Sequence, residues 1–384
     1  MKISIIVNGR FHFYDLAREL SLLSHDVGLI STLPVYYIKR RAKLDSSKIC
    51  SFTTLEVIKR IVERLHFYNI KFDILQKKLF SIYSFSKLDK SSRALIFFAG
   101  NGWFSKYLHT IKNDLYLIAD EGSAHPFTVN KLLNDEYCRI GLKRNNASRA
   151  ILDNETNIQY RIADYVVVPS TFVKNSLILN GIDQEKIFVN PYGVDIEAFC
   201  PSSVRVLDSK FRIMFCGLLS IQKGSHTFLE IASHFKGNEN IEFIHVGGID
   251  KEISKILNGY SLPNFKHYEP VQQEELSSFY NSSDLFILPS IQDGFAMVVL
   301  QAMACGVPVI CSKNSCGPDI IEHGVDGFVV NPVDLQSYIS YIKILYKDRV
   351  LLSKFKSIVR KKVVNNFTWQ MYAQRYSEIL INLK

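Results

Sequence analysis

The chain has 384 residues, of which 47% are hydrophobic and 22% charged, and its formal net charge is +9. This length suits two domains of roughly 150–200 residues each. The composition excludes an intrinsically disordered chain, a collagen-like repeat and a disulfide-stabilised miniprotein. No apolar run approaches the ~18–20 residues that a membrane-spanning helix needs. The first run, 3–7, is soon followed by Arg10 and His12, so it predicts a buried strand and not a signal peptide.

Short apolar runs alternate with helix-length amphipathic segments, which is typical of parallel sheets covered by helices. Residues 163–170 and 283–290 share a small residue, Asp, four apolar positions and Pro-Ser, which indicates two similar Rossmann-like units. The predicted fold class is therefore α/β, with two parallel sheets facing a central cleft. Strands are expected at 3–7, 27–30, 94–98, 115–118, 165–168, 212–215, 241–246, 285–288 and 308–311.

Turn-forming residues around 190–201 divide the chain. We expect an N-terminal domain over 1–190, a linker over 191–205 and a C-terminal domain over 206–365. The last segment, 366–384, predicts a helix that packs back on the N-terminal domain. The seven cysteines are scattered without a CxxC pair, which favours reduced thiols in a cytosolic protein and argues against structural zinc.

The positive charge is concentrated in the first half. Residues 1–190 hold 27 Lys and Arg against 18 Asp and Glu, whereas residues 191–384 hold 19 of each. The stretch from Lys39 to Arg93 alone has 14 basic and 5 acidic residues, interleaved with aromatic ones. Such a surface suits an anionic membrane or a phosphorylated acceptor, and the alternatives are a solvated helical face or nucleic-acid binding.

A candidate phosphate site lies at residues 217–224, with the sequence GLLSIQKG. The chain has no Walker A, GxGxxG or Asp-x-Asp motif, so it must hold phosphate with lysine, backbone amides and helix ends. Gly217 permits close approach to a ligand, and Lys223 precedes a helix whose free N–H groups favour an anion. A glycine turn with a solvated lysine is the alternative.

A second candidate site covers 293–309, with the sequence DGFAMVVLQAMACGVPV. A helix beginning at Gly294 would offer the N–H groups of Phe295, Ala296 and Met297 to hydroxyls or phosphate oxygens. Asp293 would cap this helix, and Gln301 lies just over two turns further on, facing the same crevice.

These motifs resemble the donor half of a family 4 retaining glycosyltransferase with the GT-B fold, of the kind used in bacterial surface-polysaccharide synthesis. The matching stretches occur in the same order as in that family: GLLSIQKG at 217–224, DLFILPS at 284–290, DGFAMVVLQAMACGVPV at 293–309 and EHGVDGFVV at 322–330. In the first half, ADYVVVPS at 163–170, PYGVD at 191–195 and DEGSAH at 120–125 agree with it, while 36–93 is poorly matched.

The resemblance implies that the C-terminal domain binds a nucleotide diphosphate sugar. Lys223 would contact the diphosphate, Asp293 the sugar and Gln301 the ribose, with the amides of Phe295, Ala296 and Met297 nearby. Three positions depart from the family pattern: Leu218 replaces an arginine, and Asp293 and Gln301 replace glutamates. We interpret these departures as the pattern of a subgroup.

The opposite wall of the predicted cleft would be formed by the N-terminal domain. Gly9 would approach the donor, and Arg10, His12, Glu121 and His125 are candidates on the acceptor side. With Lys223 and Asp293, His125 completes the expected catalytic set, although a lone histidine is more often a structural hydrogen-bonding residue.

The resemblance therefore implies a retaining hexosyltransferase that moves a sugar from a nucleotide diphosphate sugar to a hydroxyl of a glycan or lipid-linked acceptor, without a metal ion or other cofactor. The protein would be cytoplasmic, in contact with the inner face of the membrane through Lys39 to Arg93, and would bind no nucleic acid. A nucleotide-sugar epimerase of the same architecture and a non-catalytic nucleotide-sugar-binding protein remain alternatives.

Overall fold

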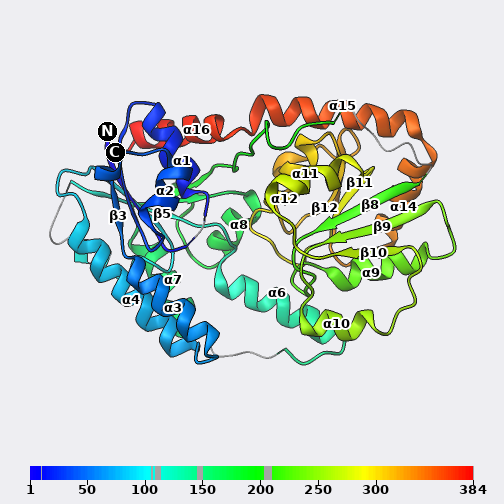
Figure 1. The fold of residues 1–384 in the computed structure, drawn as a ribbon, viewed down its shortest axis with the longest axis horizontal. Helices are drawn as coiled ribbons and strands as arrows, with labels where there is room; N and C mark the ends of the chain where they lie inside the picture. Colours follow the sequence, from blue (N-terminus) through cyan, green and yellow to red (C-terminus); the bar gives the residue numbers. More distant parts are fainter. Residues whose placement is uncertain (10, 105–106, 109–113, 145–149, 203–209, 384) are drawn as a thin grey trace.

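The computed structural model describes residues 1–9, 11–104, 107–108, 114–144, 150–202 and 210–383. Within these residues the chain forms two parallel sheets, each covered by helices, at the two ends of an elongated molecule (Figure 1). The first sheet has the strand order β3-β2-β1-β4-β5-β6-β7, and the second has the order β10-β9-β8-β11-β12-β13. In both sheets the order reverses beside the first strand, at β1/β4 and β8/β11, which is where open α/β sheets bind ligands.

The strands confirm the predicted alternation and add short ones at or near the sheet edges. All nine predicted strands exist, four with the predicted ends and five with an end shifted by one or two residues, whereas β3, β7, β10 and β13 were not predicted. The strands of the first sheet are β1 (Lys2–Val7), β2 (Asp26–Ser31), β3 (Ile49–Ser51), β4 (Ala94–Phe98), β5 (Tyr116–Asp120), β6 (Tyr165–Val168) and β7 (Ile187–Val189). Those of the second are β8 (Phe211–Cys216), β9 (Ile241–Val246), β10 (Phe265–Tyr268), β11 (Leu285–Leu288), β12 (Val309–Ser312) and β13 (Gly327–Val330).

Helices connect successive parallel strands, as a parallel sheet requires. In the first domain they are α1 (Phe13–Leu22), α2 (Val35–Ala42), α3 (Thr53–Arg64), α4 (Ile70–Lys87), α6 (Pro126–Arg139), α7 (Ala150–Ile162) and α8 (Thr171–Leu179). In the second they are α9 (Ser225–His234), α10 (Lys251–Leu257), α11 (Gln273–Asn281), α12 (Met297–Ala304), α13 (Gly317–Ile320), α14 (Leu335–Lys347) and α15 (Arg349–Asn366), followed by α16 (Trp369–Ile381). In the described part of the chain, no helix is both long and apolar enough to cross a bilayer.

The repeated Asp of the two similar segments has the same role in each sheet. Asp164 precedes β6, and its carboxylate accepts a hydrogen bond from the backbone N–H of Leu117, at 2.7 Å. Asp284 precedes β11, and its carboxylate accepts one from the N–H of Arg212, at 3.1 Å. Each Asp thus accepts a hydrogen bond from a backbone N–H near the start of a neighbouring strand. Strand pairing provides no other acceptor for this N–H.

The last helix, α16, packs on α1 of the first domain. Its buried face carries Tyr372, Ala373, Tyr376 and Leu380. The imidazole Nε2 of His25 and the hydroxyl of Ser377 are 2.8 Å apart, and Arg375 donates to Asn190 Oδ1 at 2.8 Å. The chain therefore crosses between the two domains twice, once at 190–202 and once between α15 and α16.

Polar contacts, several of them buried, join the two domains. The Nε2 of His226 in α9 is 2.5 Å from a carboxylate oxygen of Glu136 in α6, and both side chains are buried. Ser170, which caps α8, donates its hydroxyl to the carbonyl of Gly294 at 2.6 Å. Asp319 accepts hydrogen bonds from the hydroxyl and the N–H of Thr171. These contacts hold the facing sides of the two domains against each other.

Candidate functional site

The phosphate-binding loop predicted at 217–224 follows β8 directly and has a constrained backbone. Gly217 has φ +119°, and its carbonyl accepts a hydrogen bond from His245 Nε2 at 2.9 Å. Burial lowers the pKa of His245 to about 4, so the ring is neutral and its other nitrogen accepts from His267. Gly224 has φ +66° and is the N-cap of α9; a Cβ there would lie 1.9 Å from the carbonyl oxygen of Pro289. Only glycine fits this close approach.

Lys223 extends from this loop towards β11 and pairs with Asp293. The ammonium group donates to Asp293 Oδ2, and both side chains are partly buried. The prediction that Asp293 caps a helix is wrong, as is the predicted helix start at Gly294. The helix α12 begins at Met297 with Ala296 as its N-cap. The carboxylate is therefore directed towards Lys223 of the same domain and not onto the helix.

The segment from Gly294 to Ala296 leads into α12 without regular secondary structure. Phe295 and Ala296 are buried, and the side chains of Phe295, Met297 and Gln301 border a cavity between the domains. The Oε1 of Gln301 accepts a hydrogen bond from the hydroxyl of Tyr280 at 3.0 Å. Gln301 is thus oriented by a buried tyrosine.

Gly294 lies directly against the first domain. A Cβ built on it would be 1.9 Å from the carbonyl oxygen of Gly122 and 2.7 Å from the Cα of Ser123. Both atoms belong to the backbone that follows β5, so no side-chain movement relieves the contact. Glycine at this position lets the two walls of the crevice meet.

His12 lies on the opposite wall and forms a buried pair with Asp120. The ring nitrogen Nε2 is 3.0 Å from Asp120 Oδ1, and the ring packs on Tyr192 with 4.3 Å between centroids. His12 also borders the cavity between the domains. Sequence reasoning missed the role of Asp120; its position at the carboxyl end of β5 was the available signal.

Gly9 follows β1 with φ +95°, and its carbonyl accepts a hydrogen bond from the hydroxyl of Tyr14 at 2.8 Å. A Cβ on Gly9 would meet no atom within 4 Å, so the backbone is open on that side. The predicted residue Arg10 lies outside the described residues. Leu218, on the donor-side loop, is exposed.

Glu121 and His125 are buried and do not border this cavity, which differs from the prediction that they face an acceptor. His125 is the N-cap of α6, and its Nδ1 accepts a hydrogen bond from the N–H of Phe127. Its Nε2 lies 3.1 Å from Asn157 Oδ1. Burial lowers the pKa of His125, so the ring stays neutral and structural in this position. The local Asp-Glu-Gly-Ser-Ala-His pattern does not distinguish a capping histidine from a substrate contact.

The carboxylate of Glu121 accepts hydrogen bonds from Ser123 N–H and from the hydroxyl of Tyr160, each at 2.8 Å. It thereby fixes the loop on which Gly294 rests. Burial raises the pKa of Glu121 from 4.5 to about 7.

This raised pKa predicts a measurable pH dependence of stability. The folded state binds more protons than the unfolded state between the two pKa values, so the stabilisation is present below the unfolded pKa of 4.5 and is lost as pH rises through about 7. We expect the free energy of unfolding of Glu121→Gln to rise by about 3 kcal/mol relative to that of the wild type when the pH is raised from about 5 to about 8. Urea unfolding at both pH values measures this difference, with the exposed Glu239→Gln as the control. The same dependence of unfolding free energy on pH in Glu121→Gln and the wild type would contradict the prediction.

The cavity between the domains has a volume of ≈ 800 Å³ and a strongly basic side. Arg18 from α1 and Arg40, Arg41 and Lys43 from α2 and its C-terminal end border it. Buried Asp15 accepts from Arg18 Nη1 at 2.8 Å and from Arg41 Nη2 at 2.9 Å, which orients these two guanidinium groups. Arg40 and Lys43 form no ion pair with any described residue. The charge count indicated this basic surface, but not that it borders the crevice.

The comparisons with known proteins agree with this arrangement. A family model described as glycosyl transferases group 1 matches residues 202–362. The amylovoran biosynthesis glycosyltransferase AmsK of Erwinia amylovora is 26% identical over 55% of this chain and 54% of its own length. A UDP-Gal:α-D-GlcNAc-diphosphoundecaprenol α-1,3-galactosyltransferase of Escherichia coli is 28% identical over 53% of this chain and 56% of its own. The chain spans between about two fifths and three fifths of the length of the first curated relatives that it matches.

Solved structures resemble the whole chain. The structure of HepE from Anabaena in complex with UDP superimposes with a TM-score of 0.69 at 14% identity, covering 100% of both chains. At this identity the similarity establishes the fold alone. Residues 202–362 therefore resemble the group 1 glycosyl transferases, and the two facing parallel sheets of the chain have the GT-B fold.

Proposed function

We propose that this protein is a retaining glycosyltransferase that moves a hexose-type sugar from a nucleotide diphosphate sugar to a hydroxyl of a glycan or lipid-linked acceptor, without a metal ion. The observation that carries the proposal is the pairing of Lys223, beside the Gly217 loop and the N-terminus of α9, with Asp293, which borders the cavity between the domains. These residues lie in the segment that resembles the group 1 glycosyl transferases.

The donor side supplies positive charge where a diphosphate would leave. Lys223 and the free N–H groups at the start of α9 would stabilise the negative charge that develops on the diphosphate, as a preorganised oxyanion site does. In this proposal the diphosphate competes with Asp293 for the Lys223 ammonium group. Released from that pair, Asp293 is free to accept hydrogen bonds from sugar hydroxyls, and Gln301 would both accept from and donate to the ribose.

The basic side of the cavity supports an anionic acceptor. Arg40 and Lys43 have charges that no described acidic residue offsets, and Asp15 holds Arg18 and Arg41 in place. A lipid-linked diphosphate or an acidic glycan fits this charge. With such an acceptor the protein would work as a peripheral protein at an anionic membrane surface.

Retention would follow from attack of the acceptor hydroxyl on the face of the sugar that the diphosphate leaves. The acceptor proton would pass to the departing diphosphate, and the acceptor oxygen would form the new glycosidic bond. The contacts between Gly294 and Gly122 and between Ser170 and Gly294 would exclude water from the donor during the reaction.

The test is calorimetric titration of the purified protein, without added metal, with UDP, GDP, ADP and CDP. We expect selective binding of one nucleotide, with UDP first because HepE binds it, and weaker binding of this nucleotide by Lys223→Ala. Absence of binding by all four to the folded protein would overturn the proposal. With the matching sugar nucleotide, release of free sugar product that needs no acceptor would favour an epimerase instead.

A further inference from the structure

Helix α3 exposes an apolar face. Of its 12 residues only Leu55 is buried. Its exposed side chains include Val57, Ile58 and Ile61, and the chain continues through exposed Leu65 to Phe67, which is 71% accessible in the turn before α4. A helix on a protein surface normally turns such residues inward, so this one is unusual.

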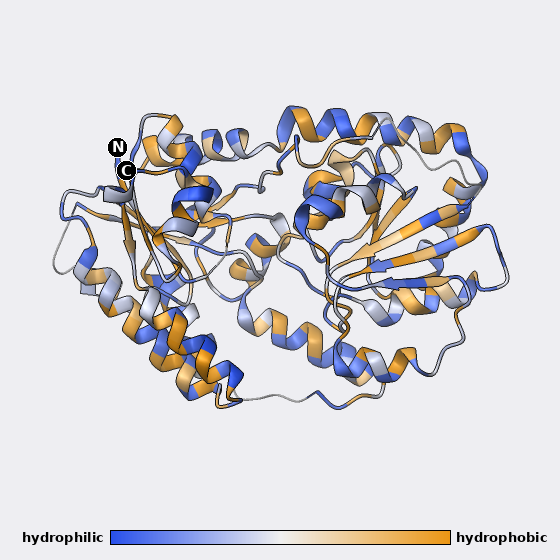
Figure 2. Ribbon diagram, viewed as in Figure 1, coloured by the Kyte–Doolittle hydropathy of each residue, from blue (hydrophilic) through white to orange (hydrophobic). Residues whose placement is uncertain are grey.

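Helix α4 buries three polar side chains beside Phe80 and exposes several apolar ones. Gln76, Ser81 and Ser84 are buried, whereas Leu75, Leu79 and Ile82 are 52%, 41% and 50% exposed at the i, i+4, i+7 spacing of one helical face. Figure 2 shows apolar residues along both helices of this pair. A hydrophobic stripe facing outward over polar buried residues indicates that a partner covers the stripe.

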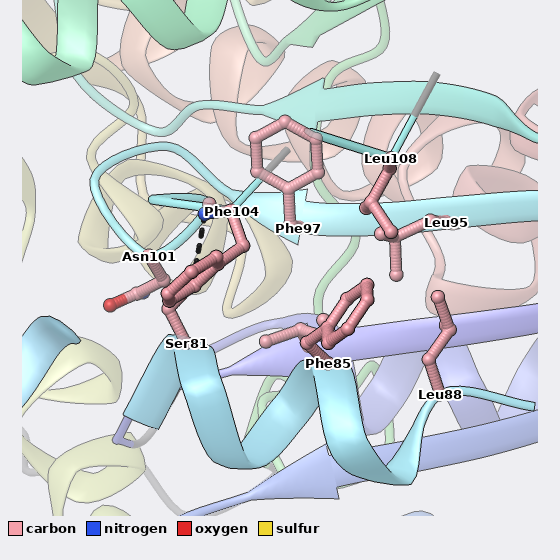
Figure 3. A pocket seen from close by; sticks show the side chains of 10 residues that line it. Ser81, Phe85, Leu88, Leu95, Phe97, Asn101, Phe104 and Leu108 are labelled. Atoms are coloured by element: carbon pink, nitrogen blue, oxygen red, sulfur yellow. Dashed lines mark hydrogen bonds between the residues drawn. The ribbon is translucent and has the colours of Figure 1, made fainter. Parts of the chain in front are cut away.

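The inner side of α4 is already filled. Ser81 accepts a hydrogen bond from the N–H of Phe104, and Phe85 and Leu88 face Leu95 of β4 across a small pocket (Figure 3). This pocket has a volume of ≈ 20 Å³, which is room for about one water molecule. The exposed stripe therefore does not result from a helix that is loosely attached to its sheet.

The charges around the stripe are mainly positive. Residues 53–87 contain seven Lys and Arg and three Asp and Glu. Each acidic residue pairs with a basic residue of the same helix, in the pairs Glu56–Arg60, Glu63–Lys59 and Asp73–Lys77. Arg64, Lys71, Lys78 and Lys87 have no ion pair with any described residue. Long basic side chains beside exposed apolar and aromatic groups are typical of helices that lie in the interface of an anionic bilayer.

We propose that the α3–α4 hairpin, residues 53–87, is a docking surface for an anionic lipid bilayer. The apolar stripe would enter the acyl boundary, Phe67 and Tyr68 would lie at the level of the headgroups, and the unpaired basic side chains would contact lipid phosphates. This inference deepens the proposed function. A lipid-linked acceptor of the proposed reaction would lie in the bilayer to which this hairpin docks.

Co-sedimentation with vesicles tests the surface. We expect the wild type to bind vesicles of phosphatidylcholine with phosphatidylglycerol and to bind pure phosphatidylcholine weakly. The variant Leu75→Gln/Leu79→Gln/Ile82→Gln should lower partitioning at least about tenfold. The matched control, Leu179→Gln/Val350→Gln/Ile381→Gln, removes exposed apolar side chains elsewhere and should bind like the wild type.

Charge is tested separately. Arg64→Gln/Lys71→Gln/Lys78→Gln should lower partitioning to the anionic vesicles, and added salt should lower it for the wild type as well. No binding of the wild type to anionic vesicles, or unchanged binding of the apolar variant, would overturn the inference. The inference would also be overturned if the wild type were a dimer, the apolar variant were a monomer, and vesicles had no effect on either protein.

Nucleotide titration of the same samples separates the two proposals. Both hairpin variants should bind the selected nucleotide with wild-type affinity, because none of the substituted residues borders the cavity described here. A wild type that binds anionic vesicles but no nucleotide would overturn the proposed function and leave the membrane surface intact.

Discussion

Lys223→Ala is expected to lower turnover by about 2–4 kcal/mol of barrier, or about 30- to 900-fold, with a smaller loss in affinity for the donor. The reason is that charge accumulates on the leaving diphosphate in the transition state, so a cation there contributes more to the rate than to binding. Turnover with saturating sugar nucleotide and acceptor measures the effect.

The control must account for Asp293, which loses its partner in this variant. Asp293→Asn with Lys223 retained separates loss of the cation from loss of the pair, and Lys251→Ala, on α10 of the same domain, controls for a change in net charge. Wild-type turnover in Lys223→Ala would remove the lysine from the mechanism.

Gly294→Ala is expected to lower turnover about 100-fold while each domain stays folded. The added methyl group would meet the backbone at Gly122 and Ser123 of the opposite domain at 1.9 Å and 2.7 Å. The crevice cannot close around such a contact without moving the donor relative to the acceptor. The hydrogen bond from Ser170 to the Gly294 carbonyl would also be lost.

Two measurements distinguish this effect from simple unfolding. Nucleotide affinity should remain within a few-fold of the wild type, since the phosphate site lies in one domain, and small-angle scattering should show a larger radius of gyration. Gly237→Ala is the matched control, because a Cβ there meets nothing within 4 Å. Full turnover in Gly294→Ala would show that this contact is not needed for the reaction.

The strands that could be predicted are those whose apolar runs are long enough to stand out from their surroundings. The strands β1, β4, β8 and β9 are buried over most or all of their length. In contrast, β3 and β7 have three residues each, and Phe265–Tyr268 of β10 is mostly exposed and partly polar. These edge strands exist because a neighbouring strand offers free backbone groups, which local sequence does not reveal.

The part of the site that could be predicted is the loop that directly follows a predicted strand. The loop at Gly217 and Lys223 lies at the end of β8, where the motif placed it. Asp293 pairs with Lys223, 70 positions away, and local sequence does not reveal such a distant partner. From local sequence alone, an Asp before a helix is expected to cap it. The same limit applies to His12 and Asp120, 108 positions apart, since only the sheet order brings β1 and β5 near one another.

The return of α16 to the first domain has a consequence for biosynthesis. Tyr372 and Tyr376 contribute fully buried side chains beneath α1, and they leave the ribosome after every strand of both sheets. The first domain therefore cannot complete its hydrophobic core until α16 has left the ribosome, although this domain is made first. The second domain has all of its strands and helices α9 to α15 by Asn366 and can finish earlier. The order of maturation is thus the reverse of the order of synthesis, and the unfinished first domain is the part that a chaperone would meet.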